Sequence, residues 1–229
     1  MLKTVIWDND GVLVDTEELY FNTTRKALTK VGVDLTRDLF VRISLKQGRS
    51  TFDLAAAQGV GQEVIARLRA DRNKRYCDLL RNGVSVMDGV EDTLRQLQGR
   101  VLMGVVTNSR REHFEIIHTA TGLLHYFDFV LTREDYNKSK PDPDSFLTAI
   151  KQNGLQQQHC IIVEDSERGF AAAKAAGIRC IMVPNSLTKD GNFPGAYRVL
   201  NNAGEVAAEV LQLLRLPDQF IKKEGENIA

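Results

Sequence analysis

The sequence predicts an α/β protein whose core is a doubly wound parallel sheet, and two observations lead to this prediction. Short β-branched apolar runs, typical of buried parallel strands, recur at 4–7, 101–106, 127–131, 160–163 and 178–183. Amphipathic patterns typical of helices lie among them, at 89–98, 110–120, 143–153 and 167–176. This alternation places helices on both faces of the sheet, and ligands then bind at the carboxyl ends of the strands.

A helical insert interrupts the alternation after the first strand. From Glu17 to about Arg81 the sequence shows helical periodicity and no strand pattern. Because this stretch precedes the second strand, we expect a helical-bundle cap over the strand ends, joined to the core by crossings near Val14 and Val84. Such a cap closes over a substrate and excludes water. The predicted domains are a core of residues 1–14 and 84–229 and a cap of residues 15–83.

Composition and charge favour small-molecule chemistry. A chain of 229 residues with 43% hydrophobic content can bury a sizeable core. Thirty basic residues balance thirty acidic ones, so no net field attracts nucleic acid or an anionic membrane. The sequence shows neither a secretory signal nor a run of roughly 20 apolar residues, which favours a cytoplasmic protein. We expect a monomer or a weak homodimer.

The cysteines and histidines show no spacing that predicts a disulfide framework or a zinc site. We expect buried free thiols at Cys77, Cys160 and Cys180. We expect surface or hydrogen-bonded imidazoles at His113, His118, His125 and His159. The polar segment after Pro217 is expected to be frayed.

Two aspartates follow the first predicted strand. Asp8 and Asp10 stand two residues apart, and Gly11 permits a sharp turn that leaves both carboxyl groups at the sheet edge. Like charges this close repel unless a cation or a shared proton compensates, so the pair indicates a metal site or an acid/base dyad. The alternative is a strand-end turn capped by aspartate.

The fourth strand ends in a second acidic pair, Glu164 and Asp165. Two strands of one sheet therefore bring four acids to one edge. Capping of the next helix by Asp165 or Ser166 is an alternative that can coexist with metal ligation. Hard oxygen donors without a neighbouring histidine or cysteine favour Mg²⁺.

The predicted phosphate ligands lie in two other loops. Thr107, Asn108 and Ser109 lead from the second strand into a helix, where a hydroxyl and free backbone N–H groups suit phosphate oxygens. Lys140 precedes a proline, which restricts the backbone of a turn that carries a positive charge. Taken singly, the first feature also fits a helix cap and the second a solvated lysine.

Four segments, WDNDGVL, VVTNS, SKPDPDSF and IIVEDSERGFAAAKAAGI, resemble in order and spacing the motifs of the haloacid dehalogenase superfamily. The resemblance covers nearly the whole chain and implies a Rossmann-type core. It implies that Asp8 is the nucleophile, Asp10 the general acid/base, and Thr107 and Lys140 ligands of the phosphoryl oxygens. It also implies an Mg²⁺ site formed by Asp8, Asp10, Glu164 and Asp165.

This resemblance implies a phosphotransferase that works through an aspartyl-phosphate. Asp10 protonates the leaving oxygen and then takes a proton from the attacking water, while Mg²⁺ and Lys140 offset charge on the phosphoryl group. The motif departs from the family pattern at Asn9, where a hydrophobic residue is usual, and at Trp7, where phenylalanine is usual. Neither departure affects the proposed chemistry.

The helical insert resembles the small cap of the subgroup that contains β-phosphoglucomutase and many sugar-phosphate and phosphoglycolate phosphatases. Tyr20 stands where the mutases carry a histidine, so we expect a phosphatase of a small phosphorylated metabolite. The alternative is a phosphomutase. A non-catalytic binding module is expected to lose Asp8 or Asp10, and both are present.

The residues predicted to contact the substrate are Arg49, Arg72, Arg110, Asn108 and Thr16. Arg49 lies in a run, QGRSTFDLAA, that resembles the substrate loop of the cap. Each arginine also fits a solvated surface position. Thr16 either lines the cavity between cap and core or starts the first cap helix.

Overall fold

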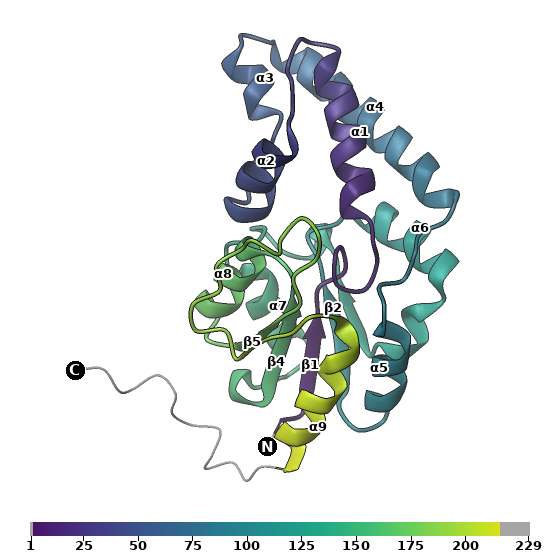
Figure 1. The fold of residues 1–229 in the computed structure, drawn as a ribbon, viewed down its shortest axis with the longest axis vertical. Coiled ribbons are helices and arrows are strands. Elements are labelled where there is room, and N and C mark those ends of the chain that lie inside the picture. Colours follow the sequence, from purple (N-terminus) through teal and green to yellow (C-terminus); the bar gives the residue numbers. More distant parts are fainter. Residues whose placement is uncertain (1, 216–229) are drawn as a thin grey trace, which may run out of the picture.

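The computed structural model describes residues 2–215 and shows a parallel six-stranded sheet with helices on both faces (Figure 1). The spatial order is β3-β2-β1-β4-β5-β6. The strands are β1 (Thr4–Trp7), β2 (Leu102–Val106), β3 (Phe129–Leu131), β4 (Cys160–Glu164), β5 (Arg179–Met182) and β6 (Arg198–Val199). The predicted fold class is confirmed. The segment after Pro217 lies outside the described residues.

The strand β1 shows how the sheet divides the core into two layers. Val5 and Trp7 point into an apolar cluster on one face, and Ile6 points into a second cluster on the other. The first layer contains α5 (Val90–Leu97), α6 (Arg111–Thr121) and α9 (Val206–Arg215), and the second contains α7 (Asp144–Gln152) and α8 (Glu167–Ala175). Because both faces of the strand are covered, all four residues of β1 are buried.

The connections contain short 3₁₀ turns, at Leu123–Tyr126, Arg133–Asp135, Gln157–His159 and Ala203–Glu205. The structure adds two elements that the sequence analysis did not predict. The strand β6 has only two residues, both exposed, and therefore no apolar run to reveal it. In α9, however, the buried residues Val206, Val210 and Leu213 recur with helical spacing, so its signal is present in the sequence.

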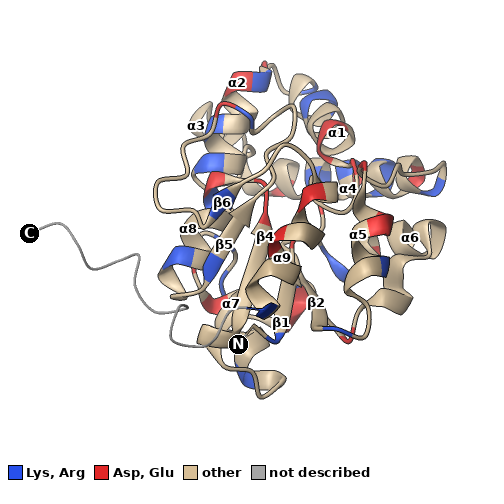
Figure 2. Ribbon diagram, turned by 60° about the horizontal axis from the view of Figure 1, so that its bottom comes forward, with Lys and Arg blue, Asp and Glu red and all other residues tan. Residues whose placement is uncertain are grey.

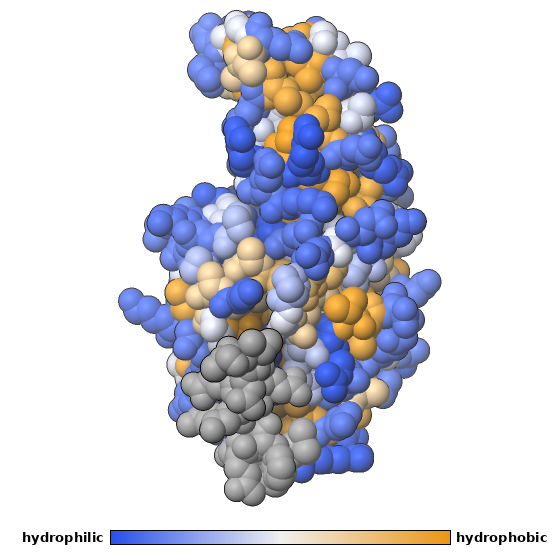
Figure 3. All heavy atoms as spheres, turned by 60° about the vertical axis from the view of Figure 1, so that its left-hand side comes forward, coloured by the Kyte–Doolittle hydropathy of each residue, from blue (hydrophilic) through white to orange (hydrophobic). Residues whose placement is uncertain are grey.

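The residues 17–81, here called the helical segment, form a separate group of helices above the sheet (Figure 1). They contain α1 (Glu17–Thr29), α2 (Arg37–Phe40), a π-helical turn (Val41–Lys46), α3 (Asp53–Ala57) and α4 (Gln62–Arg81). Most of their apolar side chains form a third cluster, which Leu187 joins from outside the segment, whereas Tyr76 and Leu80 of α4 pack in the first cluster. Figure 3 shows this segment as the narrower upper lobe of the molecule. The absence of strands predicted for this stretch is confirmed.

The two crossings to the helical segment run side by side. Val14 forms an antiparallel bridge with Val86. The backbone N–H of Asp15 donates to the carbonyl of Ser85 at 2.9 Å, and the N–H of Met87 donates to that of Leu13 at 3.0 Å. A hinge between two domains would need two such adjacent crossings. The division into a core and a cap domain stays a prediction. No helix within residues 2–215 is both long and apolar enough to cross a membrane.

Candidate active site

A cavity of about 370 Å³ lies between the carboxyl ends of the strands and the helical segment. The core contributes loop residues after β1 and β2, and the helical segment contributes residues of α1 and α4. Figure 2 shows acidic positions beside β4 at the centre of the molecule and basic positions along α4. The lining includes Asp8, Asp10, Thr107, Asn108, Lys140 and Glu164 from the core and Thr16, Glu17, Tyr20, Arg69, Arg72 and Tyr76 from the crossing and the helical segment.

Lys140 is the central charge of this site, although its side chain is only 2% exposed. Its ammonium donates to Asp8 Oδ1 at 2.7 Å, to Glu164 Oε1 at 2.7 Å and to the carbonyl of Val106 at 2.8 Å. Burial by itself lowers the pKa of Lys140, but the two carboxylates outweigh burial and raise it above its ordinary value. The lysine is therefore charged, and all three of its N–H groups are used.

Asp8 is a buried carboxyl group with a strongly perturbed acidity. Burial, reinforced by the negative charge of Glu164, raises the pKa of Asp8 to about 7, although Lys140 acts in the opposite direction. Among the described residues, no donor bonds Oδ2 of Asp8, so that oxygen is left for a ligand. A perturbed carboxyl group in a cavity is a candidate for catalysis or metal binding.

Asn108 and Tyr136 fix the loop that carries Lys140. The Asn108 amide accepts from the backbone N–H of Lys140 at 3.1 Å and donates to its carbonyl at 3.3 Å. The Tyr136 hydroxyl lies 2.9 Å from Asn108 Oδ1 and 2.7 Å from the carbonyl oxygen of Thr107, and these two acceptors share its one proton. Asn108, predicted to bind substrate, lines the cavity, but its amide holds Lys140. Sequence reasoning missed Tyr136, because its partners Thr107 and Asn108 lie 29 and 28 positions earlier in the chain.

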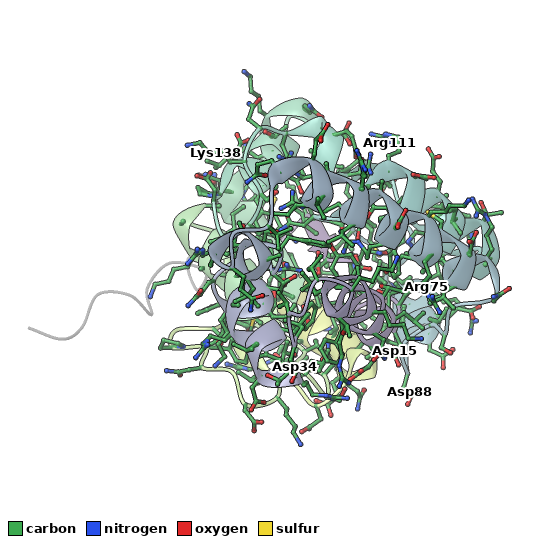
Figure 4. All side chains as sticks on the ribbon, turned by 90° about the horizontal axis from the view of Figure 1, so that it is seen from above. Asp15, Asp34, Arg75, Asp88, Arg111 and Lys138 are labelled. Atoms are coloured by element: carbon green, nitrogen blue, oxygen red, sulfur yellow. The ribbon has the colours of Figure 1, made fainter. Side chains whose placement is uncertain are left out.

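The same loop holds a second lysine with the opposite orientation. Lys138 is exposed and pairs with Asp142 across 3.6 Å. Viewed from above the helical segment, Lys138 and Arg111 point outward at the rim of the molecule (Figure 4). Of the two lysines in this loop, Lys140 lines the cavity and Lys138 does not.

The Asp10 carboxylate accepts hydrogen bonds from four side chains around the cavity. Oδ1 accepts from the Thr16 hydroxyl at 2.5 Å. Oδ2 accepts from Ser109 at 2.6 Å, from Thr107 at 3.3 Å and from the Asn9 amide at 3.2 Å. These donors hold the carboxylate of Asp10 at the cavity wall.

Asn9, the departure in the first motif, is fully buried and has a specific partner. His118 on α6 donates from Nε2 to Asn9 Oδ1 at 2.8 Å, and its Nδ1 accepts from the Thr121 hydroxyl at 3.1 Å. Burial lowers the pKa of His118 to about 4, so the ring is neutral near pH 7. The prediction of a hydrogen-bonded imidazole is confirmed here. A buried amide in a position that is usually apolar is satisfied in this way.

Three acidic side chains lie close together and form a set of ligands that fits a divalent cation. One carboxylate oxygen from each of Asp8, Glu164 and Asp165 lies within 4.8 Å of the other two. Asp165 Oδ2 also accepts from the Asn185 amide at 2.8 Å. All three donors are carboxylate oxygens, which is the donor set that Mg²⁺ prefers. The carboxylate of Asp10, the fourth predicted ligand, instead accepts from the hydroxyls of Thr16, Thr107 and Ser109.

The helix α8 begins at this cluster. Ser166 caps the helix, with its hydroxyl accepting from the N–H of Gly169 at 3.2 Å. Glu164 Oε2 accepts from the backbone N–H of Asp165 at 3.1 Å and from the Ser166 hydroxyl at 3.2 Å. Capping and a candidate metal site thus coexist, and Glu164 is oriented by the helix start on one side and by Lys140 on the other.

We expect Gly169→Ala to damage this arrangement. A Cβ atom at Gly169 would stand 2.0 Å from the carboxyl carbon of Glu164, so this buried side chain must shift away from Lys140. Chemical unfolding should show a loss of about 1–3 kcal/mol. Gly61→Ala is the matched control, because no described residue has an atom within 4 Å of its Cβ, and it should change stability by less than about 0.5 kcal/mol. Equal stability of the two variants would contradict the packing described for Glu164.

The predicted substrate residues are only partly brought together. Thr16, Arg72 and Arg110 line the cavity with Asn108. Arg49 lies outside the lining, is 66% exposed and pairs with Asp53 across 3.6 Å. Arg69, one turn before Arg72 on α4, lines the cavity instead. Its helical spacing from Arg72 is the signal that sequence reasoning passed over.

A partly buried contact between a glutamate of α1 and an arginine of α8 was also missed. Glu17 faces Arg168 across 3.8 Å, and the Arg168 guanidinium donates to the carbonyl of Ser44 at 3.3 Å. Burial raises the pKa of Glu17 to about 8 despite the opposing effect of Arg168. Arg168 therefore connects the sheet part of the molecule to two elements of the helical segment beside the cavity. Nothing in the sequence links residues 17 and 168, since each alone reads as a helix-surface charge.

Comparison with known proteins agrees with this architecture. A family model described as haloacid dehalogenase-like hydrolase matches residues 5–183. The chain is 31% identical to fructose-1-phosphate phosphatase YqaB of Escherichia coli (strain K12) over 189 residues, which cover 78% of this chain and 95% of that protein. It is 27% identical to a phosphorylated carbohydrates phosphatase of Thermotoga maritima, with 93% and 99% covered.

A solved structure of a CbbY variant from Rhodobacter sphaeroides, in complex with xylulose-(1,5)bisphosphate, has the same fold. Its TM-score is 0.77 at 24% identity, with 90% of this chain and 96% of that chain covered. The family model spans more than half of the chain, and it includes the acids, hydroxyls and lysine of the cavity. This chain belongs to the haloacid dehalogenase-like hydrolase family.

Proposed function

We propose that the protein is a magnesium-dependent phosphatase that hydrolyses a small phosphorylated metabolite, a sugar phosphate or a phosphoglycolate-like ester, through an aspartyl-phosphate on Asp8. The observation that carries this proposal is the placement of Asp8, bonded to the Lys140 ammonium at 2.7 Å, beside Asp10 in one cavity at the strand ends. The phosphatases named among its relatives support the same class of reaction.

In the first step, a carboxylate oxygen of Asp8 attacks the phosphorus atom in line with the departing oxygen, and the P–O bond to the leaving group breaks. Asp10 gives its proton to that oxygen. In the second step, Asp10 takes a proton from water as the water oxygen attacks phosphorus, and the bond to Asp8 breaks. The hydroxyls of Thr16 and Ser109 hold Asp10 in place for both transfers.

Lys140 orients Asp8 and offsets part of its charge. Because its remaining N–H groups go to Glu164 and to a backbone carbonyl, its position is fixed before substrate arrives. Asp8 and Asp165, with Glu164 beside them, would hold Mg²⁺. When bound, this ion supplies positive charge opposite the phosphoryl oxygens. Thr107 is proposed to bind a phosphoryl oxygen through its hydroxyl.

The far wall of the cavity favours a hydroxylated substrate. Buried polar atoms without a hydrogen-bond partner in the described structure include Arg72 Nε and Asn73 Oδ1, and both residues line this cavity. Such atoms carry a desolvation penalty that a ligand's hydroxyl or carboxylate groups would relieve. The wall thus fits a sugar phosphate or a phosphorylated acid better than an apolar ester.

The phosphatase reaction is favoured over the mutase alternative by the surroundings of Tyr20. Its ring lies 4.3 Å from the Arg72 guanidinium carbon and packs edge-on against Tyr76 at 5.3 Å. A mutase would use an imidazole at position 20 to act on the sugar hydroxyl, and this chain has a packed tyrosine ring there. We further propose a cytoplasmic location, which the three free and buried cysteines support.

Phosphate release tests this function. The purified protein should release phosphate from a panel of sugar phosphates, phosphoglycolate and nucleotides when Mg²⁺ is present, and a chelator should abolish the release. Bisphosphate-dependent isomerisation of a hexose 1-phosphate at a higher rate than hydrolysis would identify a mutase instead. Turnover that is equally fast with and without Mg²⁺ would contradict the proposed cofactor.

A further inference from the structure

A second group of potential metal ligands lies between the long helix of the helical segment and the core. One donor atom from each of Cys77, Glu112 and His113 lies within 4.8 Å of the other two. Cys77 belongs to α4, and the other two residues belong to α6, which packs against it (Figure 1). Because the cysteine and the histidine are 36 positions apart, linear spacing could not reveal this group, and the sequence analysis predicted no such site.

The histidine of this group is unusual in its hydrogen bonding. His113 is buried, with only 3% of its surface exposed. Its Nε2 has no hydrogen-bond partner in the described structure. The expectation of a surface or hydrogen-bonded imidazole is wrong at this position. The ring packs edge-on against Tyr76, with centroids 5.0 Å apart, which fixes its plane beside Cys77. A buried, unsatisfied nitrogen on an imidazole ring that groups with a thiol and a carboxylate needs an explanation.

We propose that Cys77, Glu112 and His113 bind a zinc-class divalent cation, with water as a fourth ligand. Tetrahedral zinc sites are built from thiolate, imidazole and carboxylate donors, with ligand atoms about 3.3–3.8 Å apart. The present spacing therefore needs only a small contraction. Glu112 is exposed, so the ion has a route from solvent. On binding, the Cys77 thiol releases its proton to solvent, and the thiolate sulfur bonds the metal.

The two groups of potential metal ligands within residues 2–215 differ in donor chemistry, and this difference predicts their selectivity. Asp8, Glu164 and Asp165 offer only oxygen, whereas the new site offers sulfur, nitrogen and oxygen. Soft sulfur and imidazole nitrogen select Zn²⁺ or Co²⁺ over Mg²⁺. An ion in the new site would join α4 to α6 at the wall of the cavity that His113 lines. This inference does not depend on the proposed phosphatase chemistry.

Titration of the metal-free protein with Co²⁺ in the presence of excess Mg²⁺ tests the site. Mg²⁺ occupies the oxygen site, so Co²⁺ should produce the near-ultraviolet absorption of a thiolate–cobalt bond, and Zn²⁺ should remove this band by displacement. Cys77→Ser should lose the band. The control Cys160→Ser removes a thiol from β4, far from the group in sequence and fold, and should retain it.

Two further variants keep the test decisive if Cys77→Ser fails to fold. Glu112→Gln alters an exposed side chain, and His113→Gln removes the imidazole; each should weaken Co²⁺ binding by about 10-fold or more, since loss of even an indirect ligand contact costs that much. Absence of the band at saturating Co²⁺, or a band of equal strength in Cys77→Ser, would overturn the proposal. Unchanged Co²⁺ affinity in both of the other variants would overturn it as well.

Discussion

Asp8→Asn is expected to lower the rate of phosphate release by about ten-thousand-fold or more, the scale seen when an enzyme loses its covalent nucleophile. The asparagine amide has nearly the same shape, and its oxygen can still accept from Lys140, which donates to Asp8 Oδ1 at 2.7 Å. The amide, however, cannot attack phosphorus. The loss should therefore appear in kcat, measured with saturating Mg²⁺ and the best ester of the panel.

Asp88→Asn is the matched control for this variant. Asp88 is exposed, lies outside the cavity lining and points outward at the edge of the molecule (Figure 4). It should leave the rate within a factor of about two, as surface substitutions have little effect on structure. An Asp8→Asn protein that keeps a tenth or more of the rate would show that another group attacks phosphorus.

Lys140→Met should both unfold more easily and lose activity. The methionine preserves length but leaves the buried carboxyl groups of Asp8 and Glu164 facing each other without a cation. Removal of one partner from a buried ion pair costs about 3–5 kcal/mol. Urea unfolding without added divalent cation measures this loss, since a bound cation would offset the same repulsion. Lys138→Met, in the same loop but exposed, is the control and should change stability by less than about 0.5 kcal/mol.

The stability loss of Lys140→Met should depend on pH. The pKa of Asp8 is already about 7 with the lysine in place, and loss of the positive charge raises it further. An acid whose folded pKa exceeds its unfolded pKa destabilises the fold above the unfolded value of about 4, and more so as pH rises toward the folded value. The loss should therefore be larger at pH 8 than at pH 5. A loss that is equal at both pH values would contradict the charge argument.

The fold was largely predictable because its main signals are local. Buried runs such as 160–163 and the helical spacing of 17–81 identified the sheet and the segment above it. The grouping of the acids and the lysine was predictable because the carboxyl ends of parallel strands meet at one edge of the sheet. Residues that follow different strands therefore lie close together in space. The short edge strand β6 was not, since its two exposed residues depend on pairing with β5.

The partners that orient the site were beyond sequence reasoning, because each is a contact between distant elements. Asn9 is satisfied by His118, and Lys140 is held by Asn108. The Glu17–Arg168 pair and the unsatisfied nitrogen of His113 depend on how the helical segment lies on the core. A single sequence shows the residue types but not these pairings.

Chemical trapping tests the central claim, covalent attack by Asp8, most directly. The protein would be mixed with radiolabelled acetyl phosphate and Mg²⁺, quenched in acid during turnover, and treated with borohydride, which reduces an aspartyl-phosphate to homoserine. We expect acid-stable label on the protein and homoserine at position 8 of the N-terminal peptide. Turnover without protein-bound phosphate, or with label on any other residue, would contradict this claim.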